Sequence, residues 1–178
     1  MGQNFSGWVK YKFKAPRGTK ISCRYGELLY EDGTLNPMTS VCGQIKGTRK
    51  NSVGEEIPVG GPGSPETAWQ SDVYIAKGDG WEEYSPRFTF HAFRFIEISG
   101  YPGILSPDMI LGMRLNTDVS KAGSFSCSNE MFNDIQTMSR LTFLSNLFSV
   151  QSDCPHRERF GYGGDIVGTN EAIIFNFD

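Results

Sequence analysis

The sequence predicts a mainly β fold, an antiparallel β-sandwich followed by helices. Apolar and polar residues alternate with a period of two through most of the first two thirds of the chain, as expected for strands with one buried face. Near residue 120 the apolar spacing changes to three and four, which is typical of an amphipathic helix. The chain also contains 21 Gly among 178 residues and 13% aromatic residues. This composition favours short strands joined by turns and argues against an all-helical bundle.

Two strands open the predicted sandwich. In residues 8–14 apolar side chains alternate with three lysines, and residues 21–25 repeat the alternation against polar and basic residues. Both segments therefore read as half-buried antiparallel strands. The sequence Glu31-Asp32-Gly33 follows and predicts a turn, because glycine tolerates a positive φ.

Three further strands are expected before residue 116. They cover residues 73–76, 88–98 and 109–115, with glycine-containing turns between them. The longest, 88–98, carries aromatic residues on both faces, which predicts a central position in the sandwich. The polar, Gly- and Pro-rich stretch 46–65 has no periodicity and is expected to be a long loop, either a lid or a plain insertion.

The last third of the chain predicts two helices. Ser128 is the expected N-cap of the first, which should run for about six turns through Phe148, at roughly 3.6 residues per turn. A polar loop covers residues 151–164, and a second, weaker helical pattern begins at Asp165. Because two helices cannot bury their apolar faces alone, they are expected to pack on the sandwich or to begin a larger helical domain.

Charge and hydropathy exclude several classes of function. The net charge of −3 and the pI near 5.4 provide no basic field for a nucleic-acid backbone. No run approaches the ~20 apolar residues of a membrane helix, so we expect a soluble chain. The first residues lack the pattern of a secretory signal, and the compartment cannot be read from the sequence.

The spacing of cysteines and histidines predicts no metal site. Cysteines stand at positions 23, 42, 127 and 154, in a spacing that matches neither a zinc pattern nor a dense disulfide framework, so free or buried thiols are expected. His91 falls in a predicted strand and His156 in the polar loop, and no ligand spacing links them. We therefore expect neither a metal nor another cofactor.

The densest polar cluster lies in the loop between the two predicted helices. Residues 153–165 contain three carboxylates and two arginines, together with glycines and rings that could shape a polar cleft. Neighbouring carboxylates keep a carboxyl group protonated to higher pH, as a general acid requires, whereas arginines oppose that shift. Glu158 lies five residues after Asp153 and seven before Asp165, so a folded-back loop could bring all three towards one sugar.

This loop resembles the catalytic loop of the α-L-rhamnosidases of glycoside hydrolase family 78. Its sequence is Asp-Cys-Pro-His-Arg-Glu-Arg-Phe-Gly-Tyr-Gly-Gly-Asp, with tyrosine where the family usually has tryptophan and histidine where glutamine is common. Upstream segments resemble the family's β-sandwich: Gly26-Glu27-Leu28-Leu29, Asp72-Val73-Tyr74, Pro86-Arg87-Phe88 and His91-Ala92-Phe93-Arg94-Phe95. The segment Gly123-Ser124-Phe125 and the helix after it resemble the junction into an (α/α)6 barrel.

The resemblance implies a sandwich domain at residues 1–118 and the start of an (α/α)6 barrel at 119–178. It also implies an inverting hydrolase of terminal α-L-rhamnosyl groups, acting on a rhamnose-containing oligosaccharide, polysaccharide or glycoside. Glu158 matches the general acid, and the substrate-binding positions are matched by Asp153, Arg157, Tyr162 and Asp165. In an inverting enzyme the second carboxyl lies about 6.5 to 9.5 Å from the first, and the family draws it from much later in the barrel.

A carbohydrate-binding module is the alternative. Trp8, Trp69 and Trp81 could stack on sugar rings, although packing in the core is the more frequent role of tryptophan. Such a module would not need the loop at 153–165, so this loop distinguishes the two functions.

Overall fold

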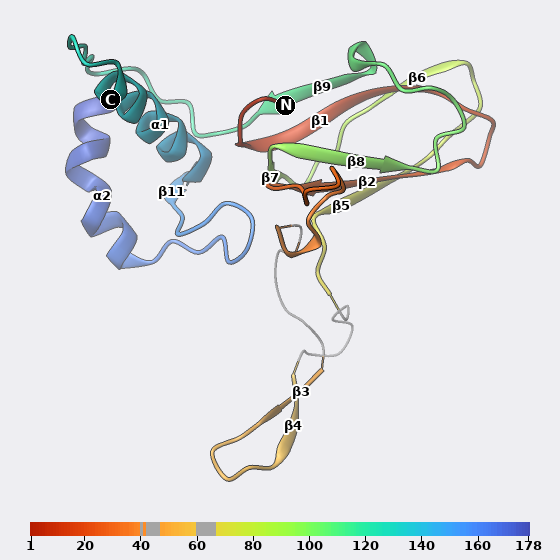
Figure 1. Cartoon of the computed structure of the whole chain (residues 1–178), viewed down its shortest axis with the longest axis horizontal. Helices are drawn as coiled ribbons and strands as arrows, with labels where there is room; N and C mark the ends of the chain where they lie inside the picture. Colours follow the sequence, from red (N-terminus) through yellow and green to blue (C-terminus); the bar gives the residue numbers. More distant parts are fainter. Residues whose placement is uncertain (40, 42–46, 60–66) are drawn as a thin grey trace.

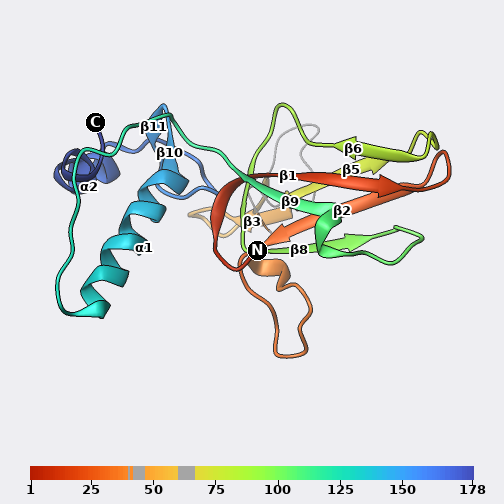
Figure 2. The ribbon, with the colours of Figure 1, turned by 90° about the horizontal axis from the view of Figure 1, so that it is seen from above.

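The computed structural model describes residues 1–39, 41, 47–59 and 67–178. A two-layered β structure forms one part of the molecule, and two helices lie beside one end of it (Figure 1). Seen from above, the helices stand next to the strands and do not cover the face of either sheet (Figure 2). The mainly β class predicted from the sequence is therefore confirmed.

The sandwich consists of two antiparallel sheets. In the first, β1 (Phe5–Lys14) pairs with β6 (Trp81–Tyr84), β7 (His91–Phe93) and β9 (Ile110–Arg114). In the second, β2 (Lys20–Gly26) lies between β5 (Ser71–Ile75) and β8 (Phe95–Ser99). Short 3-10 turns occur at Pro37–Thr39 and Pro107–Met109.

The core lies between β1 and β2, as their alternation predicts. Its largest fully buried side chains include Tyr11, Phe13, Ile21 and Tyr25, while the lysines of β1 point away from it. Such aromatic and branched side chains supply the hydrophobic burial that holds two sheets about 10 Å apart. The first two predicted strands are therefore confirmed.

The prediction of one long central strand at 88–98 is wrong. Residues 88–90 lie outside any strand, with the Phe88 side chain fully exposed, and the ladder breaks at Arg94. Before the break β7 pairs with β1, whereas after it β8 pairs with β2. The chain thus crosses from one sheet to the other, a common way to form a corner in a sandwich. Aromatic residues on both faces come from two short strands in different sheets.

A buried glutamine supports this crossing. The side-chain amide of Gln70, which is 0% exposed, accepts a hydrogen bond from Ala92 N and donates one to Ala92 O. Its backbone oxygen accepts from Tyr25 N of the other sheet. One residue therefore satisfies backbone groups of both sheets where the ladder is interrupted.

The sandwich also contains a strand that the sequence pattern did not predict, β6. Trp81 of this strand is 56% exposed beneath Lys12, and Trp69 is 38% exposed with the Arg24 guanidinium over its ring. A position in the core is therefore wrong for these two tryptophans, although each ring packs against the side chain of a basic residue. Trp8 of β1 is half-buried.

A hairpin occupies part of the stretch predicted as loop at 46–65. It consists of β3 (Gly47–Lys50) and β4 (Glu56–Val59), and it projects away from the sandwich (Figure 1). Asn51 closes its turn, because its Oδ1 accepts from Val53 N and Glu55 N. The loop prediction is wrong for these residues, while residues 46 and 60–65 lie outside the described part of the chain, as does Cys42.

The two helices begin and end differently from the prediction. Helix α1 (Glu130–Asn146) is capped by Asn129, whose Oδ1 accepts from Met131 N, and not by Ser128. It ends before Phe148 because a small hairpin follows, β10 (Leu147–Phe148) with β11 (Val150–Gln151). Helix α2 (Gly163–Asn176) begins two residues before Asp165.

Apolar side chains of both helices remain exposed to solvent. On α1 they include Met131, Phe132 and Met138, and on α2 they include Val167 and Phe175. Exposed rows of this kind are expected where helices begin a larger helical domain, the second of the two predicted arrangements. No helix in the described ranges has the length and apolar content required to span a bilayer.

A chain of polar side chains crosses the core of the sandwich. Tyr11 donates a hydrogen bond to Tyr25, and Tyr25 donates one to Asp72 Oδ2, each with an oxygen–oxygen distance of 2.6 Å. His91 Nε2 lies 3.1 Å from both carboxylate oxygens of Asp72. Burial raises the pKa values of Tyr11 and Tyr25 above their ordinary range, so both phenols stay protonated. His91 is therefore part of a chain of polar contacts that links the two sheets.

Candidate functional site

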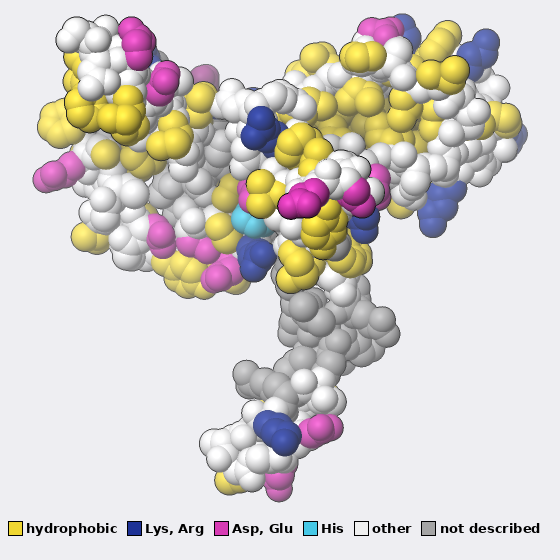
Figure 3. Space-filling view, in the orientation of Figure 1, with side chains coloured by type: hydrophobic (Ala, Val, Ile, Leu, Met, Phe, Trp, Pro, Cys, Tyr) yellow, Lys and Arg dark blue, Asp and Glu magenta, His cyan; other side chains and the backbone are white. Residues whose placement is uncertain are grey.

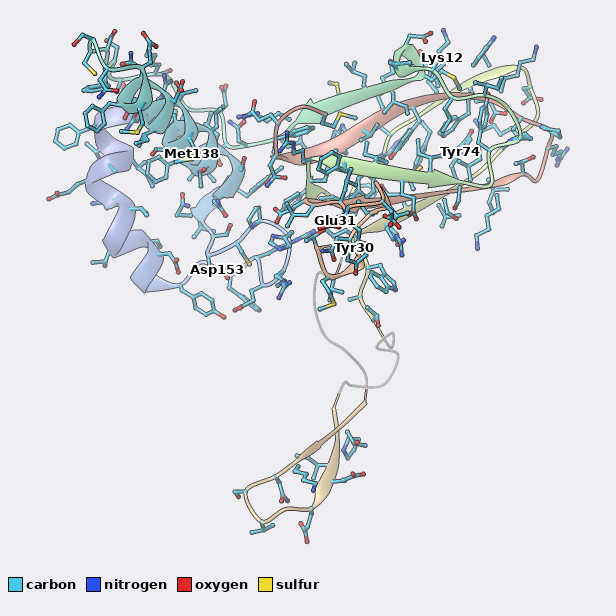
Figure 4. All side chains as sticks on the ribbon, in the orientation of Figure 1. Lys12, Tyr30, Glu31, Tyr74, Met138 and Asp153 are labelled. Carbon is cyan, nitrogen blue, oxygen red and sulfur yellow. The ribbon has the colours of Figure 1, made fainter. Side chains whose placement is uncertain are left out.

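The polar loop connects β11 to α2 and lies between the helices and the sandwich. Figure 4 places Asp153 on this connection, and Figure 3 shows acidic, basic and histidine side chains where it meets the sandwich. Two hydrogen bonds of 3.0 Å close the loop, from Asp153 N to Phe160 O and from Phe160 N to Asp153 Oδ1. Within it, Glu158 N donates to Cys154 Sγ. Cys154, Cys127 and the buried Cys23 are free thiols.

Glu158 lies on the exposed side of the closed loop. Its Oε2 accepts a hydrogen bond of 2.6 Å from the hydroxyl of Tyr162, whose ring is tilted against that of Phe160. The hydrogen bond to the Glu158 carboxylate raises the pKa of Tyr162 to about 12, because the phenolate would face a negative charge. Tyr162 therefore remains a hydrogen-bond donor that orients one oxygen of Glu158.

This contact predicts how Tyr162 titrates. We expect its phenol to ionise near pH 12, and the midpoint to fall back towards 10.0 in a Glu158→Gln variant, which removes the carboxylate charge. The midpoint can be followed by NMR of ¹³Cζ-labelled tyrosine, with the Tyr162 signal identified by its loss in Tyr162→Phe. Equal midpoints with and without the carboxylate would contradict the Glu158 charge as a cause of the raised pKa of Tyr162.

Two further carboxylates lie on the same connection. Burial of Asp153 acts against its ionisation, but hydrogen bonds from Cys154 and from the Phe160 backbone outweigh burial and lower its pKa. Asp153 is therefore an anion at neutral pH. Asp165 lies half-buried in the first turn of α2, where the helix dipole favours a negative charge. Among the described residues, no hydrogen bond or ion pair joins its carboxylate to Asp153 or Glu158.

The basic residues of the loop contact the sandwich. Arg157 Nη2 donates to Met38 O at 3.2 Å, and His156 Nδ1 lies 3.7 Å from Glu27 Oε1. The guanidinium of Arg159 lies over the ring of Phe90, 4.4 Å from its centroid. Glu158 therefore lies between two arginines whose side chains are directed towards the sandwich.

Burial is the main cause of the lowered pKa of His156. Arg157 and Arg159 add to the effect, while Glu27 and Asp153 oppose it. The imidazole is therefore mostly neutral at pH 7. Neither Glu27 nor Phe90 was expected at this site from the sequence, because no local spacing signals a contact across more than sixty residues.

A pocket of about 460 Å³ opens beside the loop. It is enclosed by the N-terminus, the end of β2, one face of α1 and the first residues of the loop, and its lining includes Asn4, Glu27, Asp134, Met138 and His156. In the described ranges no three His, Cys, Asp or Glu side chains are arranged as metal ligands.

Two family models match consecutive parts of the chain. Residues 1–116 match the bacterial alpha-L-rhamnosidase concanavalin-like domain, and residues 120–178 match the bacterial alpha-L-rhamnosidase 6 hairpin glycosidase domain. The first match contains all strands of the two large sheets, and the second contains both helices and the polar loop.

Relatives in both sequence and structure are α-L-rhamnosidases. An alpha-L-rhamnosidase of Formosa agariphila is 33% identical over 99% of this chain and 16% of its own length. The structure of alpha-L-rhamnosidase from Dictyoglumus thermophilum superposes with a TM-score of 0.81 and 42% identity over 99% of this chain and 17% of that one. The Streptomyces avermitilis alpha-L-rhamnosidase, solved in complex with L-rhamnose, gives a TM-score of 0.80 and 29% identity over 99% of this chain and 15% of that one.

The chain thus spans about a sixth of the length of these relatives, given the 16% and 17% that it covers. It comprises a sandwich and the first helices of an (α/α)6 barrel, with the polar loop between those helices. Both family models and the structural likeness agree over nearly all of its residues, and the chain therefore belongs to the bacterial α-L-rhamnosidase family.

Proposed function

We propose that the full-length protein hydrolyses terminal, non-reducing α-L-rhamnosyl residues with inversion, and that Glu158 is its general acid. The observation that carries this proposal is the exposed Glu158 carboxyl, held at one oxygen by Tyr162 on a closed loop. Because Tyr162 occupies Oε2, Oε1 is left to carry the proton. A positioned carboxylic acid of this kind is what glycoside cleavage requires on the leaving-group side.

The reaction then proceeds in one displacement. Glu158 transfers its proton to the glycosidic oxygen as the bond from that oxygen to the anomeric carbon breaks. Water attacks the same carbon from the opposite face and gives a proton to a second carboxylate. We propose that this carboxylate comes from a barrel segment of the full-length protein without a counterpart in residues 1–178.

The remaining predicted site residues are proposed to bind the rhamnosyl group. The ionised Asp153 and the carboxyl group of Asp165 supply hydrogen-bond acceptors for sugar hydroxyls, and Arg157 keeps donors beyond the one used on Met38 O. Tyr162 adds a ring against which a sugar face can pack. We propose domain limits of 1–118 and 119–178, and rhamnose-containing oligosaccharides, polysaccharides or glycosides as substrates.

Release of rhamnose from an aryl α-L-rhamnoside tests the function. The full-length protein should release it, and NMR should detect the β-anomer first, as inversion at the anomeric carbon demands. Residues 1–178 alone should be inactive for lack of the second carboxylate. First release of the α-anomer would disprove inversion. Inactivity of both proteins, with rhamnoside binding retained by the short chain, would favour a carbohydrate-binding module instead.

A further inference from the structure

The two arginines that flank Glu158 are both held by the sandwich domain. Arg157 donates to the backbone oxygen of Met38, and Arg159 lies over the ring of Phe90. Consecutive Cα atoms are only about 3.8 Å apart, so these contacts fix the backbone on both sides of Glu158. The general acid proposed above therefore lies between two residues that are both anchored on the sandwich domain.

Phe90 also contacts the segment of chain that leads into the polar loop. Its ring stacks on that of Phe148 in β10, with centroids 4.1 Å apart and planes 12° from parallel. One sandwich residue thus contacts the hairpin before the loop and the arginine directly after Glu158. Phe90 itself lies in the connection between β6 and β7, two strands of the first sheet.

Backbone strain is concentrated at the same place. Among the described non-glycine residues, positive φ angles occur at Ser149, with 65°, and Arg159, with 59°. Ser149 follows Phe148 and Arg159 follows Glu158, so both strained residues belong to or adjoin the Phe148–Phe90–Arg159 stack. Such conformations persist where surrounding contacts impose them, and they are common at functional sites.

We propose that Phe90 and Arg159 are positioning residues, through which the sandwich domain sets where the Glu158 carboxyl lies relative to the scissile oxygen. This inference rests on the proposed role of Glu158. A general acid must lie within hydrogen-bond reach of the atom that it protonates, and a displacement of 1 Å costs about 10²-fold in rate. The sandwich is then part of the catalytic apparatus without touching the substrate through these residues.

The leaving group provides the test. A poor leaving group, such as the sugar of a rhamnosyl disaccharide, needs the proton, whereas 2,4-dinitrophenolate leaves without it. In the full-length protein, Phe90→Ala and Arg159→Gln should lower kcat on the disaccharide by about 10²-fold while the dinitrophenyl rhamnoside loses less than about threefold, with KM nearly constant. Activity on the dinitrophenyl substrate also shows that each variant is folded. Phe90→Tyr keeps the ring and should restore the disaccharide rate.

Controls separate this inference from the proposed function. Lys12→Gln removes another cation that lies over a ring, that of Trp81, far from the loop (Figure 4), and both rates should be unchanged. Equal losses on the two substrates in Phe90→Ala and Arg159→Gln, with Glu158→Gln selective for the disaccharide, would overturn the positioning role alone. A Glu158→Gln variant that affects both substrates equally would overturn the proposed general acid, and the positioning role with it.

Discussion

We expect Glu158→Gln in the full-length protein to lower kcat on a rhamnosyl disaccharide by about 10² to 10⁴-fold, the contribution of a positioned general acid. Glutamine has the shape of glutamate, and its amide oxygen can still accept the hydrogen bond from Tyr162. The loop should therefore keep its form, and KM should change little. What the variant lacks is the proton for the glycosidic oxygen, so the loss should appear in the chemical step.

Steady-state kinetics on purified protein provide the measurement, and Glu55→Gln is the matched control. Glu55 lies in the turn of the β3–β4 hairpin, which projects away from the loop, and the substitution makes the same change from carboxyl to amide (Figure 1). Its kcat should equal that of the parent. Near-normal turnover of Glu158→Gln would show that another group protonates the leaving oxygen.

Local patterns in the sequence were sufficient to predict the strands whose side chains alternate between the core and the solvent. Tyr11 and Ile21 are buried in strands with one face in the core, and period-two alternation describes such strands completely. The pattern failed at 88–98, where one apolar run serves two sheets, because alternation does not record a change of sheet at Arg94. It also missed the hairpin at β3 and β4, whose turn depends on the Asn51 side chain.

In the candidate site, contacts between residues close in the sequence could be predicted, whereas contacts between distant residues could not. The contact of Glu158 with Tyr162 spans four residues, so its members stand together in the sequence pattern of the loop. The contacts of Arg159 with Phe90 and of His156 with Glu27 join residues 69 and 129 positions apart, as their numbers show. No propensity or spacing encodes such pairs. They follow only from how the sandwich and the helices pack.

The second large effect is expected in the core of the sandwich, at Asp72. Its carboxylate accepts from Tyr25 of its own sheet and contacts His91 of the other sheet, with side-chain exposures of 9% for Asp72 and 6% for His91. Polar groups so well buried must find partners within the protein, since water cannot replace them. Removing the carboxylate therefore leaves the Tyr25 hydroxyl and His91 Nε2 without their acceptor.

We expect Asp72→Ala to lower the free energy of unfolding of the sandwich by about 3 kcal/mol, the cost of leaving two buried donors unpaired. Native-state hydrogen exchange of β1 and β2 amides in the full-length protein measures it, as exchange about 100-fold faster, since 1.4 kcal/mol corresponds to about tenfold. Asp72→Asn keeps one acceptor oxygen and should fall between. Asp79→Ala, at an exposed turn, should leave exchange unchanged. If the amides exchanged no faster in Asp72→Ala than in Asp79→Ala, the polar chain would contribute nothing to joining the sheets. Apolar packing alone would then hold together the sandwich that Arg157 and Arg159 contact.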